Sequence, residues 1–498
     1  MPSRKQSSRV YDVARRTPLD LAKNLSRQLG NTIYLKREDL QPVFSFKIRG
    51  AYNKMVHLNS SQRKKGVVCA SAGNHAQGVA LSAQKLKIPA TIVMPTTTPE
   101  IKIRAVRQYG VEVVVTGDSY DDAAHFAQQL ARKKGKIFIH PFDDPLVIAG
   151  QGTIGHEILE KCPEVDFIFV PVGGGGLIAG VAAFIKAKRP GTKIIGVEPA
   201  DSDAMARSVK AKRRVTLKEV GLFADGVAVK KVGKLSFDLT RRFVDGFITV
   251  STDEICSAMK NIYEDTRTIV EPTGALAVAG LKKFIHQHPC QGKKIVAINS
   301  GANMMFERLQ FVSERTLTGE KKEALFAITM DEKSGALKVF CKKVLGRKSI
   351  TEFNYRLMDR QQAHLFVGVG TNHPEDKKHF CHLLKKLNYQ YTDLTDNELA
   401  KLHVRHMVGG RCSAVKDEVL YRFEFPERPG ALINFLDKMV GNWNISLFHY
   451  RSHGSDSGRV LVGFEIPKKD SKRFQKFLRI LNYPYTEETD NPAYKLFL

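Results

Sequence analysis

The chain has 498 residues, which is too long for one compact core, so we expect two or three domains. A hydrophobic content of 43% and a mean hydropathy of −0.25 are typical of a globular protein and exclude a disordered chain, and no apolar run is long enough to cross a membrane. The net charge of +27 comes from lysines spread along the sequence rather than from an arginine-rich arm, so it indicates solvated surfaces and not a nucleic-acid-binding protein.

The N-terminal residues and the cysteines predict a cytoplasmic protein. Residues 1–16 are basic like a targeting peptide, but Asp12 interrupts them and a folded segment is expected from Val10. The seven cysteines are scattered and none form a C-x-x-C pair. We therefore expect no zinc or other metal site and no disulfide framework, which is typical of a reducing compartment.

The first chemical signal along the chain is Lys47, in the run S-F-K-I-R-G-A at residues 45–51. Neighbours such as Phe46 and Ile48 remove water from the ammonium group, which favours the neutral amine that attacks carbonyl carbons. Such a lysine is a candidate for a Schiff base with a carbonyl cofactor or substrate. Surface lysines also lie beside phenylalanines, with the charged end in water, so this interpretation depends on the rest of the chain.

The first two-thirds of the chain predict alternating strands and helices. The strands are short and continuously apolar, and the helices between them are amphipathic, a pattern that predicts a parallel sheet covered on both faces. Ligands of such sheets bind beyond the carboxyl ends of the strands. Strands are expected at 67–70, 91–94, 111–115, 137–139, 167–172, 194–197 and 295–298, and helices at 76–86, 100–109, 120–133, 154–161 and 178–186.

A polar loop with the sequence S-A-G-N-H-A-Q-G (residues 71–78) follows the first of these strands and becomes a helix. The free N–H groups at a helix start form an anion site that would suit a carboxylate, and Asn74 adds an uncharged amide. The alternative is a plain helix cap. His75 could be a general base, but a single histidine near a helix start is more often structural.

A second loop, G-G-G-G-L at residues 173–177, follows the strand at 167–172. Its glycines let the backbone approach a phosphate closely. Gly174, Gly176 and Ala179 also fit the dinucleotide fingerprint G-x-G-x-x-A, with Glu198 about twenty residues further on, so a nicotinamide-dependent oxidoreductase is an alternative. Against it, that fingerprint usually opens its sheet, and it leaves the reactive lysine unexplained.

A third loop, N-S-G-A-N at residues 299–303, places the Ser300 hydroxyl at the carboxyl end of the last strand. An ordinary Ser-Gly turn is the alternative. The nearby run E-P-T-G-A at residues 271–275 starts another helix, where Thr273 is interpreted as a cap.

A Schiff-base lysine, a phosphate loop, a carboxylate loop and a ring-facing hydroxyl together suit pyridoxal phosphate. On the motifs S-F-K-x-R-G-A, S-A-G-N-H-A-Q-G and G-G-G-G-L, the chain resembles the long-form, biosynthetic threonine dehydratases (threonine ammonia-lyases), from about Val10 to the C-terminus. The resemblance implies an α/β catalytic domain with the tryptophan-synthase-β-like fold. Cysteine synthases carry different lysine and asparagine motifs, and serine racemases share the first two motifs but end before the last third.

The resemblance implies a role for each motif residue. Lys47 would hold the cofactor and take the Cα proton of the substrate, L-threonine. The other cofactor contacts would be Phe46 beside the ring, Asn74 at the 3-hydroxyl, Ser300 at the pyridine nitrogen, and Gly173, Gly174, Gly175, Gly176 and Leu177 around the phosphate. Ser71, Gly73 and His75 would belong to the loop that binds the substrate carboxylate.

The Ser300 assignment narrows the chemistry. A neutral hydroxyl does not hold the ring nitrogen protonated as an aspartate would, so the ring is a weaker electron sink. Prompt loss of the β-hydroxyl is then favoured over transamination. The expected products from threonine are 2-oxobutanoate and ammonia.

The last third of the chain is a duplication. The run G-A-L at residues 335–337 recurs at 430–432, and several aromatic and aliphatic positions repeat at the same offset. A period this long indicates two copies of a small domain, each predicted as a ferredoxin-like βαββαβ unit. We expect a catalytic domain at residues 1–317 and two regulatory copies at 324–398 and 419–493.

The paired copies resemble the ACT-like regulatory domains of long-form threonine dehydratases. Residues 426–430 (P-E-R-P-G) resemble an ACT ligand loop, from which the first copy departs with D-E-K-S-G at 331–335. The resemblance implies inhibition by isoleucine, relief by valine, and a homotetramer. Three alternatives stay open: a purely structural or oligomerising pair, a serine dehydratase or racemase, and an amino-acid-sensing protein without catalysis.

Overall fold

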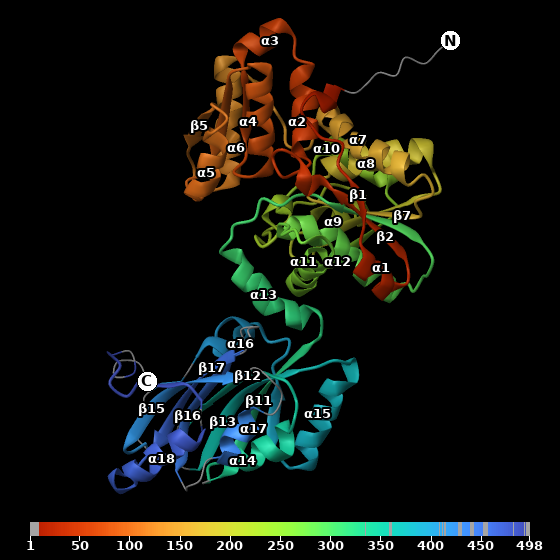
Figure 1. The fold of residues 1–498 in the computed structure, drawn as a ribbon. Helices are drawn as coiled ribbons and strands as arrows, with labels where there is room; N and C mark the ends of the chain where they lie inside the picture. The colour runs from red at the N-terminus through yellow and green to blue at the C-terminus, as the bar shows by residue number, and fades with distance from the viewer. Residues whose placement is uncertain are drawn as a thin grey trace. The chain divides into compact units, whose positions relative to one another are not determined.

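The computed structural model divides into two compact units, Met1–Thr316 and Leu317–Leu498 (Figure 1). No helix among the described residues is both long and apolar enough to cross a bilayer. The structure describes residues 9–333, 335–357, 361–407, 409–410, 412, 415–426, 431–438, 443–451, 457–481, 483–492 and 494.

A six-stranded sheet forms the larger half of the first unit, in the order β1-β2-β10-β7-β8-β9. β1 pairs antiparallel with β2 at the edge, and the other five strands are parallel. Its strands are β1 (Leu19–Leu21), β2 (Thr32–Arg37), β7 (Phe167–Pro171), β8 (Lys193–Pro199), β9 (Gly246–Val250) and β10 (Lys294–Asn299).

Helices cover both faces of this sheet and bury two separate apolar cores. The first face carries α1 (Lys23–Leu29), α11 (Thr252–Thr266), α12 (Pro272–Gln287) and part of α13 (Arg308–Gly319). The second face carries α7 (Pro145–Lys161), α8 (Gly176–Lys188), α9 (Ala204–Lys210) and α10 (Lys234–Phe243).

A smaller, fully parallel sheet in the order β5-β4-β3-β6 forms the rest of the first unit. Its strands are β3 (Val67–Ala70), β4 (Ala90–Met94), β5 (Glu112–Val115) and β6 (Ile137–Phe138). The helices α2 (Lys47–Val56), α4 (Asn74–Leu86) and α5 (Glu100–Arg107) pack on one face, and α6 (Tyr120–Lys134) packs on the other. A short helix, α3 (Ser60–Lys65), leads into β3.

The predicted strands and helices of this unit are confirmed, with two differences. The strands divide between two sheets, where the pattern predicted one, because apolar strands of similar length do not encode which neighbours they pair with. The helix expected at 154–161 begins at Pro145, where the Asp144 carboxylate accepts hydrogen bonds from the N–H groups of Leu146 and Val147.

The second unit is one antiparallel sheet in the order β14-β11-β13-β12-β16-β17-β15-β18. The first copy contributes β11 (Glu323–Asp331), α14 (Ala336–Phe340), β12 (Ile350–Arg356), β13 (Gln362–Gly370), α15 (Pro374–Lys386) and β14 (Gln390–Asp393). The second contributes β15 (Glu418–Pro426), α17 (Ala431–Lys438), β16 (Asn444–Arg451), β17 (Ser457–Glu465), α18 (Ser471–Leu481) and β18 (Tyr485–Glu487).

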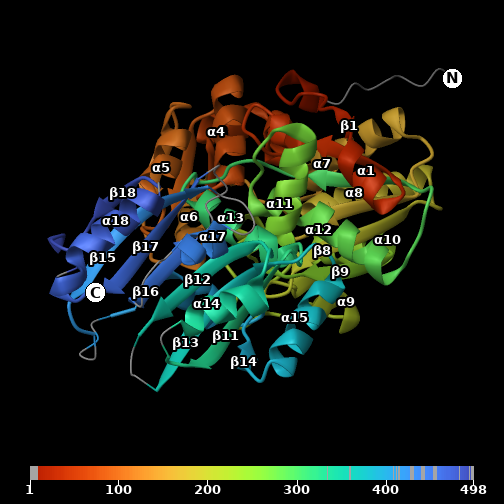
Figure 2. The same ribbon diagram turned by 60° about the horizontal axis from the view of Figure 1, so that its bottom comes forward.

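The two copies each have the predicted βαββαβ order and join through β12 and β16, which pair antiparallel at the centre of the sheet (Figure 2). The helices pack on the sheet and bury a single aromatic-rich core shared by both copies. Between the copies lie α16 (Glu398–Leu402) and a 3-10 turn at Val404–His406. Two further 3-10 turns, Glu38–Leu40 and Asp225–Val227, lie near the site described below. The P-E-R-P-G loop lies, beyond Pro426, outside the described residues.

Candidate active site

The lysine motif and the Ser300 motif meet at the carboxyl end of β10. The N–H of Phe46 donates to the carbonyl of Ser300 over 3.2 Å, and Ser45 forms a bridge with Gly301. α2 begins at Lys47 directly after this contact. Residues that are more than 250 positions apart in the sequence are therefore held side by side by backbone contacts.

Lys47 is partly buried and faces a carbonyl rather than a carboxylate. Its Nζ donates to the carbonyl oxygen of Pro141 at 2.9 Å and lies 5.3 Å from the ring centroid of Phe46. Burial lowers the pKa of Lys47 to about 8, against the opposing effect of the negative charge on Glu271. About a tenth of the amine is then neutral at pH 7 and about half at pH 8, and the neutral amine is the form that attacks a carbonyl.

The glycine loop follows β7 and opens α8. Gly175 has a φ of +94°, a backbone conformation that a side chain would strain. Among the described residues, the N–H groups of Gly174, Gly175, Gly176 and Leu177 find no hydrogen-bond acceptor. Four free donors at the start of a helix form a site for an anion such as a phosphate.

The segment from Pro141 to Asp143 links the lysine to this loop. The Phe142 ring packs on Gly174, where a Cβ atom would lie only 2.2 Å from the ring. Asp143 accepts hydrogen bonds from three N–H groups at the start of α10, including that of Ser236. Ser236 Oγ in turn donates to the carbonyl of Gly174 at 2.7 Å. The loop is therefore fixed from outside, while its N–H groups stay free.

The loop at residues 71–78 opens α4 at the carboxyl end of β3. The N–H groups of Asn74, His75 and Ala76 have no acceptor among the described residues, which fits the predicted anion site. His75 donates from Nε2 to the carbonyl of Ile139 at 2.9 Å, and its buried Nδ1 has no hydrogen-bond partner in the part of the chain that the structure describes. Burial and the positive charge of Lys47 lower the pKa of His75 to about 3, so the ring is neutral.

The Asn74 side chain is held by two groups that our interpretation of the motifs did not include. Its Nδ2 donates to Glu271 Oε1 at 2.7 Å, and its Oδ1 accepts from Asn303 Nδ2 at 2.6 Å. Burial, with the nearby negative charge of Asp225, raises the pKa of Glu271 to about 7. Glu271 was interpreted only as the start of a helix, and nothing in the sequence distinguishes it from an ordinary cap, because its partner lies 197 residues away.

Ser300 is buried, with its Oγ donating to the carbonyl of Thr273 over 3.3 Å. Thr273 is the second residue of α12, and its own buried hydroxyl finds no hydrogen-bond partner within the described ranges. The contact is long for an O–H donor, so the hydroxyl of Ser300 is weakly held and can turn to another acceptor.

The ribose-binding role considered for Glu198 finds no support in its environment. Both carboxylate oxygens accept hydrogen bonds from the start of α9, from the N–H of Met205 at 2.9 Å and of Ala206 at 2.8 Å. The side chain is fully buried, and burial raises the pKa of Glu198 to about 8. The Glu198 side chain therefore binds the start of α9 and is not exposed to a ribose.

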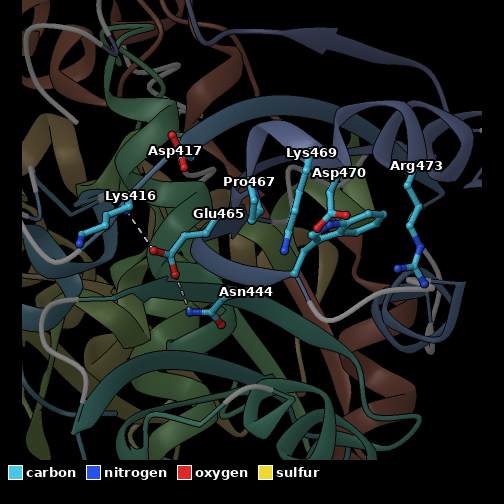
Figure 3. A pocket seen from close by; sticks show the side chains of 9 residues that line it. Lys416, Asp417, Asn444, Glu465, Pro467, Lys469, Asp470 and Arg473 are labelled. Carbon is cyan, nitrogen blue, oxygen red and sulfur yellow. Dashed lines mark hydrogen bonds between the residues drawn. The ribbon is translucent and has the colours of Figure 1, made fainter.

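A cavity of about 550 Å³ lies in the other unit beside the start of β15 (Figure 3). In it the Glu465 carboxylate accepts from the N–H of Lys416 and from Asn444 Nδ2, each at 3.0 Å. The cavity lies near the first residues of β15, whereas the predicted ligand loop begins at Pro426, the last residue of that strand. Its remaining lining residues are Asp417, Trp443, Pro467, Lys469, Asp470 and Arg473.

Two family models match the chain. Residues 10–301 match the model described as pyridoxal-phosphate dependent enzyme. Residues 314–404 and 409–498 each match the C-terminal regulatory domain of threonine dehydratase, which agrees with the duplication.

Similar proteins span the whole chain. The biosynthetic L-threonine dehydratase of Burkholderia multivorans is 53% identical over 99% of this chain and 98% of its own length. The Escherichia coli enzyme of the same name is 50% identical over 98% and 95% of the two chains. A chloroplastic biosynthetic threonine dehydratase of Arabidopsis thaliana is 50% identical over 99% and 83%.

Solved structures similar to this one cover the first unit. The processed form of threonine deaminase isoform 2 from Solanum lycopersicum is 51% identical, with a TM-score of 0.61, and covers 62% of this chain and 90% of its own. Maize serine racemase is 34% identical, with a TM-score of 0.59, and covers 64% of this chain and 97% of its own.

Proposed function

The chain belongs to the biosynthetic threonine dehydratases, pyridoxal-phosphate-dependent enzymes with a C-terminal regulatory domain, and we propose that its active site is the cluster around Lys47. The reaction is the deamination of L-threonine to 2-oxobutanoate and ammonia, the first step toward isoleucine. Residues 1–317 are assigned to catalysis, and residues 324–398 and 419–493 to the two regulatory copies.

The residues around Lys47 fit the cofactor. The four free N–H groups of the glycine loop suit its phosphate, and the partly buried amine with a lowered pKa suits its aldehyde. Lys47 and the loop residues Gly173, Gly174, Gly175, Gly176 and Leu177 would hold the two ends of the molecule. Between them, Phe46 would pack beside the ring, Asn74 would meet the 3-hydroxyl and Ser300 the ring nitrogen.

Bound pyridoxal phosphate would supply an aldehyde for the substrate amine and a ring that withdraws electrons from the Cα–H bond. Lys47, once displaced by the substrate amine, takes the Cα proton, and its lowered pKa makes the neutral form available for this step. The β-hydroxyl would then leave with a proton, so that the Cα proton and the hydroxyl together account for the water that is lost. The released 2-aminobut-2-enoate is hydrolysed to 2-oxobutanoate and ammonia.

Ser300 supports elimination over transamination. Its hydroxyl is neutral and buried at the end of β10, where it donates to the carbonyl of Thr273. It can donate a hydrogen bond to the ring nitrogen without protonating it, so a long-lived carbanion is not stabilised. Rapid loss of the β-hydroxyl follows from that weaker electron sink.

The substrate carboxylate is assigned to the loop of Ser71, Gly73 and His75. The free N–H groups at the start of α4 provide the donors, and the space beside Gly73 is open, because no described residue other than its chain neighbours has an atom within 4 Å of the position of a Cβ. His75 contributes shape rather than charge, since its ring is neutral and its Nε2 is engaged by Ile139.

For the regulatory unit, we propose that isoleucine inhibits, that valine relieves this inhibition, and that the chain forms a homotetramer. The support is the match of both copies to the regulatory domain of threonine dehydratase. An end product of the pathway is a suitable signal, but inhibition requires that isoleucine binds one state of the enzyme more tightly than another.

One spectrum and one rate comparison test the assignment. Purified protein with pyridoxal phosphate should show an absorbance band near the visible edge that disappears in Lys47→Ala. Turnover of L-threonine should exceed that of L-serine, and D-serine should not be formed from L-serine. The comparison with L-serine is needed because a serine racemase shares the fold of the first unit. A Lys47→Ala variant that keeps both the band and the activity would refute the proposed site.

A further inference from the structure

Glu271 lies where a helix cap is expected but does not act as one. It occupies the position before Pro272 at the start of α12, and its side chain makes no hydrogen bond to that helix. Only 3% of the residue is exposed. Its Oε1 instead accepts a hydrogen bond from Asn74 Nδ2 at 2.7 Å, which joins the start of α12 to the start of α4. A buried carboxyl group aimed at another amide needs a reason beyond helix capping.

The hydrogen bonds of Asn74 to other described residues use all of its side-chain amide except one N–H group. The carbonyl oxygen Oδ1 is occupied by Asn303 Nδ2 at 2.6 Å, and Asn303 Nδ2 also donates to the carbonyl of Val43 at 2.8 Å. One N–H of Asn74 is donated to Glu271. A side-chain amide has two N–H donors, so the second N–H of Asn74 is the one left for a ligand.

We propose that Glu271 is a positioning residue: by accepting one N–H of Asn74, it holds the other for the ring oxygen of the cofactor. The inference rests on the proposed function, in which Asn74 meets that oxygen. Glu271 itself does not touch the cofactor in this arrangement. A donor fixed in this way recognises the oxygen as an acceptor and therefore favours its anionic form.

Charged groups around Glu271 are consistent with a role in the site. Asp225 faces it from its 3-10 turn and, with burial, raises the pKa of Glu271 to about 7, while Lys102 on α5 lowers it. Lys102 Nζ and Asp225 are themselves paired at 2.9 Å. The negative charge of Glu271 raises the pKa of Lys47 on α2, against the effect of burial on Lys47. The carboxyl thus lies within electrostatic range of the reactive amine.

Two substitutions separate the hydrogen bond from simple packing. Glu271→Ala removes the acceptor, and Glu271→Gln keeps an acceptor oxygen in a side chain of the same size. Apoprotein of each variant is titrated with pyridoxal phosphate, with the absorbance band and the dissociation constant as readouts and circular dichroism as the check on folding. We expect affinity about tenfold or more weaker in Glu271→Ala, with a shifted band at saturation, and most of the affinity restored in Glu271→Gln.

A double-mutant cycle with Asn74→Ala tests that Glu271 acts through Asn74. In the Asn74→Ala background, Glu271→Ala should cause little further loss of affinity, because the group that Glu271 positions is already absent. Equal losses in both backgrounds, wild-type affinity and spectrum in Glu271→Ala, or a Glu271→Gln variant as weak as Glu271→Ala would each overturn the inference. Wild-type protein that takes up no pyridoxal phosphate would overturn the proposed function as well, so the two failures are distinguishable.

Discussion

Arg49 lies two residues after Lys47 on α2 and belongs to a cluster of buried charges that anchors the start of this helix. The guanidinium is fully buried and donates to both oxygens of Glu38 at 2.7 and 2.8 Å, and to both of Glu157 at 2.6 and 3.0 Å. Lys36 of β2 adds a second cation, 2.5 Å from Glu157. Two cations and two carboxylates compensate each other inside the protein, so each depends on all the others.

We expect Arg49→Met to lower the free energy of unfolding of the first unit by about 3–5 kcal/mol, because it leaves the carboxylates of Glu38 and Glu157 buried with too little positive charge. The loss of bound-cofactor absorbance in urea would report this unit, and the fluorescence of Trp443, the single tryptophan, would report the other. Arg9→Met, at an exposed ion pair, is the control and should change little. An Arg49→Met protein with the wild-type urea midpoint would contradict this account.

The lowered pKa of Lys47 predicts how the rate of cofactor uptake depends on pH. Burial lowers its pKa to about 8, and only the neutral amine attacks an aldehyde, so the rate of cofactor uptake by apoprotein should rise with pH and level off above about 8. A blocked lysine in solution, measured with the same cofactor, should level off only above about 10.4. Stopped-flow absorbance would give both curves. If the two curves coincided, Lys47 would have the reactivity of an exposed lysine.

At the same scale, the sequence alone predicts site residues that lie within motifs, but it does not indicate the residues that hydrogen-bond to them. Lys47, Asn74 and Ser300 are found because each stands in a short run whose neighbours carry the chemical meaning. The structure brings these three runs together. Glu271 and Asn303 contribute through contacts across 197 and 229 residues, and no local pattern identifies a partner at that distance.

Among the elements, the glycine loop has the strictest sequence requirements. Gly175 has a φ of +94°, and a Cβ there would lie 2.3 Å from Cε of Met205. Gly191, in the turn after α8, has open space around it and is exposed. The two glycines flank the same helix, so they separate the requirements of the loop from those of the helix.

We expect Gly175→Ala to weaken pyridoxal phosphate binding, because the strained backbone moves the free N–H groups away from the phosphate. A left-handed conformation costs an alanine about 1–2 kcal/mol, which corresponds to roughly 5–30-fold in affinity before the contact with Met205 is counted. Equilibrium titration of the apoproteins measures it, and Gly191→Ala should bind as the wild type does. Tight binding by Gly175→Ala would mean that the loop does not hold the phosphate.

The sequence predicted which segments form helices and strands better than it predicted which strands pair with one another. The strands and helices of the first unit follow from apolar runs and amphipathic spacing. In the second unit the repeat predicted two copies, and the strands and helices expected within each copy predicted the βαββαβ order. The division of the parallel strands between two sheets was not predictable. Both β3 and β7 are short apolar strands, and neither sequence indicates which strands it will pair with. Likewise, no pattern in the repeat indicated that β12 and β16 would pair.

For the whole molecule, the division near residue 317 separates two units with their own cores. α13 belongs to the first along most of its length, because Val312 is part of that core and Arg315 pairs with Asp253 of α11 at 2.5 Å.

We expect a chain ending at Gly319, after α13, to keep the cofactor band and threonine turnover and to lose its response to isoleucine. The cut retains the contacts of Val312 and Arg315, so the first unit keeps its core, while both regulatory copies are removed. Initial rates are compared in both chains without effector, with millimolar isoleucine, and with isoleucine plus valine. Full-length protein should be inhibited by isoleucine and released by valine, because the effector must stabilise one state of the enzyme over another. Inhibition that persists in the short chain would place the effector site within the first 319 residues. If isoleucine did not change the rate of the full-length protein, the two copies would have a role in structure or assembly instead.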